Sequence, residues 1–399
     1  MTDLSQTSAD PRAGRPRSAY LLWVALPLVV LGLAIAWLVS SDPLSSFRNG
    51  APPVENLTFE RTILGADGIR VLVRGGGSEA MTVAQVQVDD AFWQFTQDPP
   101  GPIARGATAW ISLPYPWVLG EAHAINVVTS TGTTFGHEIA VAVPTPTRDS
   151  LSFAAQAVLG AFVGILPVAI GLMFYPALRG VGRGGMDFLL SLTVGLLAFL
   201  FVDALEDAFE LAGEAAALFQ GPTMVVLAAA ASFLLLMAAG RRSGTPTGLA
   251  LATFIALGIG LHNLGEGLAI GAAFASGAAG LGTFLVLGFT LHNITEGIGI
   301  AAPILKQRPS LRTFAGLTLL AGGPAVVGLW IGSLAYAPQW SALALAVGAG
   351  AILQVIVELV SMQFRQRGDG TRALLAPSAM AGLAAGVGFM YLTAMLVKI

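Results

Sequence analysis

The chain has 399 residues, of which 55% are hydrophobic and only 11% are charged, and its mean hydropathy is +0.74. These values exclude a soluble globular protein and indicate one that crosses a membrane several times. The formal net charge of −3 gives no sign of a nucleic-acid partner, and the absence of cysteine excludes disulfides and thiolate metal sites, which argues against copper(I) as a dedicated cargo.

The N-terminal region consists of a polar tail followed by one apolar stretch. Residues 1–19 contain several proline and arginine residues, and we expect them to form a disordered cytoplasmic tail. Residues 20–40 carry no charge and are long enough to cross a bilayer. Because this stretch lacks a clean small-residue cleavage site, we expect it to remain as a transmembrane anchor rather than to be removed as a signal peptide.

Residues 46–147 predict a different kind of domain. Short runs that alternate or are rich in β-branched residues are separated by Gly, Pro and Asp, at 57–64, 69–73, 81–88, 108–113, 124–130 and 135–143. This spacing is typical of a small antiparallel β-sandwich, which we expect outside the cytoplasm. Candidates there for weak metal capture are His123, His137, Asp89, Asp90, Glu121 and Glu138. A purely structural role is the better reading, because isolated surface residues of these types are common and no ligating interval recurs.

Residues 151–399 contain eight further apolar stretches of transmembrane length. They lie at 151–175, 186–208, 222–239, 247–271, 281–304, 313–336, 341–363 and 376–397. Lys and Arg gather near residues 12–17, 179–183, 241–242, 306–312 and 365–372, and by the positive-inside rule these segments are cytoplasmic. The sequence therefore predicts a polytopic α-helical membrane protein with an anchor helix, an eight-helix core and a small extracytoplasmic β-sandwich. We expect it in the cytoplasmic membrane of a bacterium, with the N-terminus inside and residues 41–150 and the C-terminus outside.

The ionisable residues well inside the eight core spans are all acidic or histidine. They are Asp203, Glu206, Asp207, His262, Glu266, His292, Glu296 and Glu358. A charge at the centre of a bilayer costs about 2.5–3.5 kcal/mol even on the gentler insertion scales. Because we expect no Lys or Arg to neutralise these groups, a bound or permeating cation is the predicted partner.

One pattern, Leu-His-Asn-x-x-Glu-Gly, occurs twice, at residues 261–267 and 291–297. On a helix, His262 and Glu266 are i,i+4 neighbours, and Asn263 lies beside Glu266 at i,i+3. The second copy repeats this arrangement with its own three residues, His292, Asn293 and Glu296. Imidazole nitrogen with carboxylate and amide oxygen suits a divalent cation such as zinc, and also iron(II) or manganese(II). His262 is ~22 Å and His292 ~18 Å from the cytoplasmic ends of their spans, which predicts one shared site near the middle of the bilayer.

These two motifs resemble those of the ZIP (Zrt/Irt-like protein) family of divalent metal transporters, whose fourth and fifth helices carry His-Asn-x-Pro-Glu-Gly-type signatures. The resemblance covers residues 151–399. It implies uptake of zinc or related cations such as Fe²⁺, Mn²⁺ or Cd²⁺, commonly by a homodimer with an elevator-like movement, and no enzymatic activity. It implies six transport-site residues: His262, Asn263, Glu266, His292, Asn293 and Glu296. It also makes Asp203 and Asp207 candidates for the entrance, and Glu358 a candidate for the pathway.

The chain departs from the family pattern in three places. Gly265 and Thr295 stand where the family usually has proline, so any helix break there must be milder or come from glycine. Gly323 precedes Pro324 where a glutamate is common, which predicts one metal site rather than two adjacent ones. The connection at 240–246 is short and carries no histidine-rich segment. The predicted β-sandwich at residues 46–147, called the β-module below, has no counterpart in the family pattern.

Two other function classes fit a buried metal. An intramembrane zinc hydrolase would use a zinc-bound water, and a metal sensor would use the β-module as its input or output. Ligands duplicated on oppositely directed helices favour a passage site near the midplane over an enzyme. Metal flux into proteoliposomes separates the three classes, because only a transporter requires it.

Overall fold

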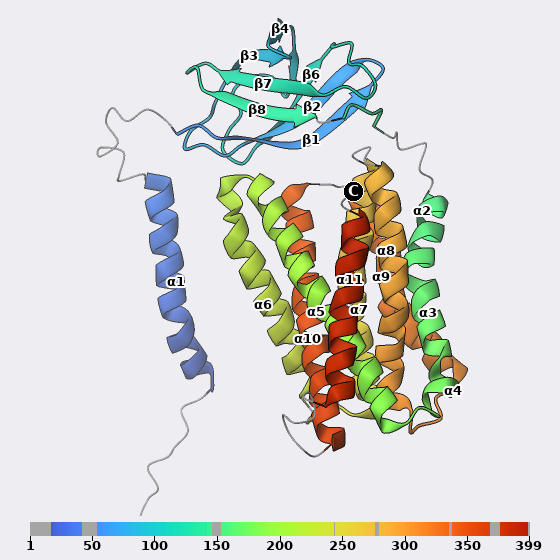
Figure 1. Ribbon diagram of the computed structural model, residues 1–399. Helices are drawn as coiled ribbons and strands as arrows, with labels where there is room; N and C mark the ends of the chain where they lie inside the picture. The colour runs from blue at the N-terminus through green and yellow to red at the C-terminus, as the bar shows by residue number, and fades with distance from the viewer. Residues whose placement is uncertain are drawn as a thin grey trace, which may run out of the picture. The chain divides into compact units, whose positions relative to one another are not determined.

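The computed structural model describes residues 17–41, 54–139, 141–145, 153–242, 244–275, 279–334, 337–367 and 376–397. This part of the chain is mostly helical, with a small region of antiparallel sheet (Figure 1). It divides into two compact units, residues 1–53 and 54–399. The described part of the first unit is a single helix, α1 (Arg17–Ser41). Most of the predicted polar tail at 1–19, with Arg12 and Arg15, lies outside the described residues.

Eight strands form two four-stranded antiparallel sheets within residues 57–139. The strands are β1 (Leu57–Gly65), β2 (Gly68–Gly75), β3 (Val83–Val88), β4 (Ala91–Trp93), β5 (Thr96–Asp98), β6 (Thr108–Leu113), β7 (His123–Thr129) and β8 (Thr134–Ile139). Their orders are β1-β2-β6-β5 and β4-β3-β7-β8. Alternate apolar residues of both sheets, such as Val71, Ile111, Val86 and Ile125, are fully buried in one shared core. The six predicted strands are all present, and the sequence pattern missed only the two short outermost strands β4 and β5.

The remaining described residues form an apolar helical bundle. Its elements are α2 (Phe153–Gly160), the π-helical turn η2 (Ala161–Ile165), α3 (Leu166–Met173), α4 (Tyr175–Leu178), α5 (Arg183–Glu214), the 3-10 turn η3 (Ala217–Phe219), α6 (Gly221–Gly240), α7 (Gly248–Ala275), α8 (Ala279–Ala301), the 3-10 turn η4 (Ala302–Ile304), α9 (Leu311–Leu334), α10 (Pro338–Arg367) and α11 (Pro377–Val397).

Seven helical segments in the described part of the chain are long and apolar enough to cross a membrane. All seven lie between Phe153 and Gln366, and each overlaps one of the predicted core spans. The apolar stretches Ala25–Trp37 in α1 and Pro377–Leu392 in α11 are shorter. The chain therefore has the character of a polytopic membrane protein, and the total of nine spans stays a prediction.

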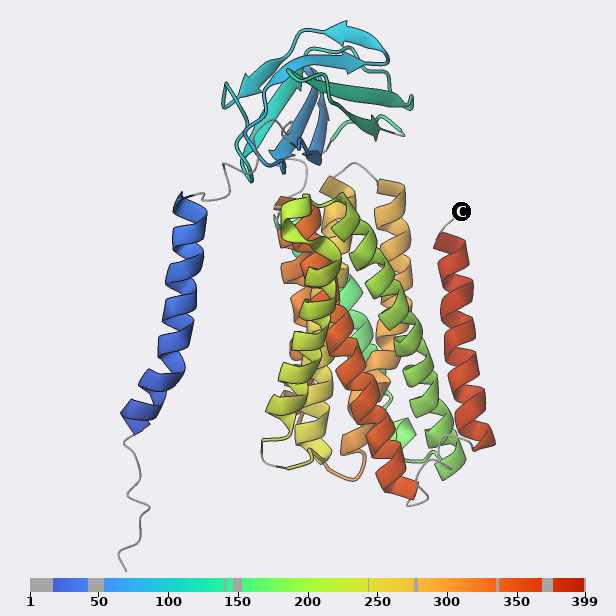
Figure 2. The ribbon, with the colours of Figure 1, turned by 90° about the vertical axis from the view of Figure 1, so that its left-hand side faces the viewer.

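Glycines allow neighbouring helices to approach closely. A Cβ atom added at Gly267 of α7 would lie 2.1 Å from the carbonyl oxygen of Ala325 on α9, and one added at Gly328 of α9 would lie 2.1 Å from that of Leu264 on α7. Helices α5 and α11 pack in the same way, with Gly195 of α5 against α11 (Figure 2). Such contacts suit helices in lipid, where association depends on close packing rather than on the exclusion of water.

Candidate metal centre

Helices α7 and α8 bring one residue triad of the duplicated motif together. The Nε2 atom of His292 lies 2.7 Å from Oε1 of Glu266, and Nε2 of His262 lies 3.0 Å from the same oxygen. One ligand atom from each residue lies within 4.8 Å of the others, and all three side chains are buried. Because the histidines come from different helices, a single carboxylate joins the two copies of the motif.

The two asparagines are anchored to the backbones of neighbouring helices. Nδ2 of Asn263 donates to the carbonyl oxygen of Ala321 on α9 at 3.1 Å, and Nδ2 of Asn293 donates to that of Val163 at 3.1 Å. Val163 belongs to the π-helical turn η2, and such turns occur frequently at functional sites. Nδ2 of Asn293 also lies 3.4 Å from Oε2 of Glu266. Each amide nitrogen is thus fixed, which leaves the amide oxygen available for another partner.

Several buried polar atoms around the triad have no hydrogen-bond partner among the described residues. They are Oδ1 of Asn263, Oδ1 of Asn293, Nδ1 of His292 and both carboxylate oxygens of Glu296. Leaving one buried polar group unpaired costs about 1–3 kcal/mol. All of these atoms can accept a hydrogen bond or donate an electron pair to a metal, given the matching histidine tautomer. Their chemistry therefore fits a divalent cation held by nitrogen and oxygen ligands.

Glu296 takes a different position from its counterpart Glu266. It is buried, with 1% of its surface exposed, and its charge is close enough to those of His262, His292 and Glu266 to interact with them. It does not join the close triad, however, and the one described side chain that approaches its carboxylate as a hydrogen-bond donor is that of Asn263. The two copies of the motif are equal in sequence but unequal in geometry.

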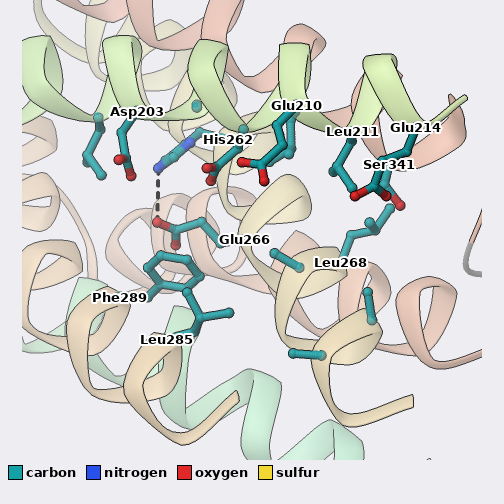
Figure 3. Close-up of a pocket in the computed structure, with 17 residues that line it drawn as sticks. Asp203, Glu210, Leu211, Glu214, His262, Glu266, Leu268, Leu285, Phe289 and Ser341 are labelled. Carbon is teal, nitrogen blue, oxygen red and sulfur yellow. Dashed lines mark ion pairs between the residues drawn. The ribbon is translucent and has the colours of Figure 1, made fainter. Parts of the chain in front are cut away.

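A cavity of about 320 Å³ opens beside the triad, and His262 and Glu266 line one of its walls. The opposite wall belongs to α5, where Asp203, Asp207, Glu210 and Glu214 occur at intervals of four, three and four residues. These intervals place all four carboxylates on one helix face. Figure 3 shows Asp203, Glu210 and Glu214 pointing from α5 toward the side that Glu266 faces from α7. The candidate entrance residues Asp203 and Asp207 thus lie beside the triad, whereas Glu206 does not line this cavity.

Glu358 lies outside this cavity and has a basic partner. Its Oε1 atom is 3.6 Å from Nη2 of Arg241, which follows the last residue of α6. The expectation that no Lys or Arg neutralises the buried acids is therefore wrong for Glu358. The reason is that a long arginine side chain at a helix end reaches back to a group buried on a neighbouring helix.

The motif helices are unbroken. Helix α7 continues through Gly265, and α8 continues through Thr295, whose hydroxyl donates to the carbonyl oxygen of His292 at 2.7 Å. The absence of proline at these two positions thus leaves regular helix. Gly323 of α9 has open space around its would-be Cβ atom and offers no side-chain ligand.

In the β-module, both ring nitrogens of His123 form local hydrogen bonds. Its Nε2 accepts from the backbone N–H of Val118 at 3.3 Å, so its Nδ1 carries the proton and donates to Asp89 at 2.8 Å. Burial alone would raise the pKa of Asp89, but hydrogen bonds from Tyr115, Ala124 and His123 lower it. The bond to Asp89 in turn raises the pKa of Tyr115 to about 12. Both nitrogens of His123 have partners, which supports the structural reading over metal capture.

His137 of β8 contacts β1 of the other sheet. Its Nε2 lies 2.9 Å from the hydroxyl oxygen of Thr62, and its ring stacks on Phe59 with 4.9 Å between centroids. Burial lowers the pKa of His137. Among the described residues, the cluster at the α7–α8 contact is the one group of three or more potential ligand residues close enough to hold a metal ion.

The backbone anchors of the asparagines could not be found from the motif. Val163 and Ala321 contribute carbonyl oxygens, and neither residue type carries a signal for that role. Glu210 and Glu214, in contrast, can be found from the sequence, because their spacing from Asp203 and Asp207 places the four acids on one helix face. No protein-family model matches the chain, and a search of curated proteins finds no match.

Proposed function

We propose that the protein is a membrane transporter that moves divalent metal cations into the cytoplasm. Zinc is the cation that we propose as its main substrate. The observation that carries this proposal is the buried triad of His262, Glu266 and His292, surrounded by unpartnered nitrogen and oxygen atoms. Such a set of ligands is costly inside a membrane unless a cation offsets it. The resemblance of the two motifs to those of the ZIP family points to the same function and implies a homodimer.

The cavity beside the triad supports transport over permanent storage of an ion. Its wall on α5 carries carboxylates from Asp203 to Glu214, a distance of ~16 Å along the helix. A row of like charges of this kind concentrates cations and draws them inward. An ion that reaches Asp203 is then adjacent to His262 in the same cavity.

The composition of that cavity argues against the hydrolase alternative. Apart from the acidic residues and His262, its described lining is apolar except for Ser341. A hydrolase needs hydrogen-bond donors aimed at a developing oxyanion, and carboxylates serve that purpose poorly. No observation in the β-module favours a sensor.

The decisive experiment measures zinc uptake by proteoliposomes that contain the purified full-length chain and a zinc-sensitive dye. We expect saturable uptake by the wild-type protein and loss of uptake in His292→Ala. His137→Gln, which changes a histidine of the β-module, serves as the matched control and should transport normally. A wild-type protein that binds zinc but carries none would refute the proposal and favour the hydrolase or sensor class.

A further inference from the structure

A second cavity, of about 920 Å³, lies at the other end of α5. The cavity beside the triad is lined by Glu214, the last residue of α5, whereas this second cavity is lined by Arg183, the first residue of α5. The 32 residues of α5 span ~48 Å, so the two cavities belong to opposite ends of the bundle. The positive-inside rule predicts that the end with Arg183 is cytoplasmic.

Four basic side chains from four separate segments line this second cavity. Arg179 follows α4, Arg183 opens α5, Lys306 follows the turn η4, and Arg365 lies near the end of α10. Asp187 is the one carboxylate among its described lining residues; it is buried and already engaged in another interaction. Among the described lining residues, four cations against one carboxylate leave an excess of positive charge.

These basic residues have no acidic partner in the described part of the chain. Arg179 lies over the ring of Tyr175, 5.8 Å from its centroid, and none of the four forms an ion pair with a described carboxylate. Like charges that share one cavity repel each other. All four residues are exposed, so water screens part of this repulsion. Their shared position at one cavity still favours an anion over a divalent cation as the occupant.

The backbone contributes further positive potential. Helices α5 and α7 both begin at this cavity, at Arg183 and Gly248. The first N–H groups of a helix lack intrahelical acceptors and favour an anion. The N-cap residue of α5 is Gly182, which has no side chain to satisfy these donors. The helix ends thus reinforce the charge of the four basic side chains.

The wall behind the basic residues is apolar. Leu178, Leu190, Leu251 and Met362 line it. An anion with a hydrocarbon part can place its charge among the basic side chains and its chain against this wall. Basic pockets between transmembrane helices on the cytoplasmic side are suited to the head groups of anionic lipids.

We propose that this cavity binds a phosphate group, with an anionic phospholipid as the natural source and free phosphate as the alternative source. The occupant links the segments that carry Arg179, Arg183, Lys306 and Arg365, which are the ends of α4 and η4, the start of α5 and the end of α10. The inference is independent of metal transport, because its residues lie apart from the triad and its test does not use metal.

The test uses the purified full-length chain in a neutral detergent, titrated in separate arms with short-chain phosphatidylglycerol, short-chain phosphatidylcholine and inorganic phosphate. Binding is followed by native mass spectrometry and by the midpoint of thermal unfolding. We expect phosphatidylglycerol to bind and raise the midpoint, with an effect that weakens at high salt. Phosphatidylcholine carries a neutral head group and should have little effect.

The double variant Arg183→Gln/Lys306→Gln should bind phosphatidylglycerol about 25-fold more weakly. The matched control Arg242→Gln/Arg308→Gln removes two charges whose residues do not line the cavity, and it should bind as the wild type does. If the double variant does not fold, Arg365→Gln alone should weaken binding about fivefold.

The outcomes separate the two sources and can overturn the site. An equal effect of inorganic phosphate at matched concentration would assign the site to free phosphate and rule out the lipid. Equal losses in the cavity variants and in the control, or unchanged binding in both, would show that no built site exists. Either of these last results would overturn the proposal.

Discussion

Glu266 is the residue that joins the two histidines of the candidate metal centre. The duplicated motif makes Glu266 and Glu296 look equivalent, yet only Glu266 lies within 3.0 Å of both imidazoles. Its second oxygen faces the amide of Asn293. A residue that touches three candidate ligands fixes their arrangement as well as contributing its own charge. Its counterpart Glu296 is buried as well but lies outside the close triad.

The two glutamates should therefore differ when each is neutralised. We expect Glu266→Gln to weaken zinc binding by more than about 100-fold, because it removes a direct ligand and the charge shared by two histidines. Glu296→Gln should weaken binding by roughly 10–100-fold, the range typical of groups that support the first ligands. Isothermal titration of zinc into the purified variants at one pH measures both values. A larger loss in Glu296→Gln would reverse this assignment.

His137 gives the β-module a dependence on pH. Burial lowers its pKa below the ordinary value of 6.5, so the folded module favours the neutral ring. The unfolded chain takes up a proton near pH 6.5, and the folded one does so only at lower pH. This contribution to stability is therefore complete above pH 6.5 and is lost as the pH falls below it.

We expect residues 54–145, expressed alone, to have a smaller free energy of unfolding at pH 5 than at pH 7.5. Their buried core consists of residues between Leu57 and Ala142, which favours independent folding. His137→Gln keeps a hydrogen-bonding group near Thr62 but does not titrate, so the difference between the two pH values should shrink. Denaturant unfolding, monitored by tryptophan fluorescence, measures the free energy of unfolding at both pH values. An unchanged pH dependence in His137→Gln would assign the effect to other groups.

The positions of the ligands depend on how closely α7, α8, α9 and the turn η2 approach one another. Gly164 in η2 and Gly322 in α9 face each other, and a Cβ atom on either would lie within 2.5 Å of the other's carbonyl oxygen. This contact holds η2 against the helix whose Ala321 anchors Asn263, while Val163 of η2 anchors Asn293. Close helix packing thus sets the direction of both amides.

The motif glycines Gly265 and Gly267 make a matched test of this packing. Gly267→Ala places a methyl group 2.1 Å from a backbone oxygen of α9, and we expect a loss of about 1–3 kcal/mol, or roughly 3–10 °C in the unfolding midpoint. Gly265→Ala meets its nearest atom at 3.6 Å and should be neutral or slightly stabilising. Thermal unfolding in detergent compares the two. Equal destabilisation would mean that α7 tolerates no side chain at either position for another reason.

Charge is divided between the two ends of the helical bundle. The carboxylates from Asp203 to Glu214 lie on the C-terminal half of α5, and the basic cavity surrounds its first residue, Arg183. A cation arriving from one side thus meets carboxylates first, while the other end is suited to anions. All three residues of the triad lie after residue 150, and none of them belongs to the β-module.

A chain that lacks residues 1–149 should therefore still bind and transport zinc. We expect lower stability or apparent affinity, with saturable uptake that depends on His262 and Glu266 and one tightly bound ion per protomer. Uptake by proteoliposomes tests this, with His262→Ala in the truncated chain as the control. A well-folded truncated protein that binds zinc but carries none would make the β-module part of the transport machinery.

Most of the helical and strand segments could be predicted from the sequence because their signals are local. Runs of about twenty apolar residues marked the long helices, and alternation marked the six longer strands. The C-terminal end of α5 was missed, since Glu210 and Glu214 lower the hydropathy there although the helix continues through them. The three-residue strands β4 and β5 are too short to carry a pattern and form by pairing with neighbouring strands.

The residue types and spacing of the duplicated motif determined which side chains are candidates for the metal, because i,i+4 neighbours share a helix face wherever the helix lies. Contacts between segments distant in the chain decided the rest. They set Glu266 apart from Glu296, paired Glu358 with Arg241, and gathered four basic residues into one cavity. Spacing along one helix cannot encode these relations, since each depends on the rotation and depth at which two helices meet, and those follow from packing.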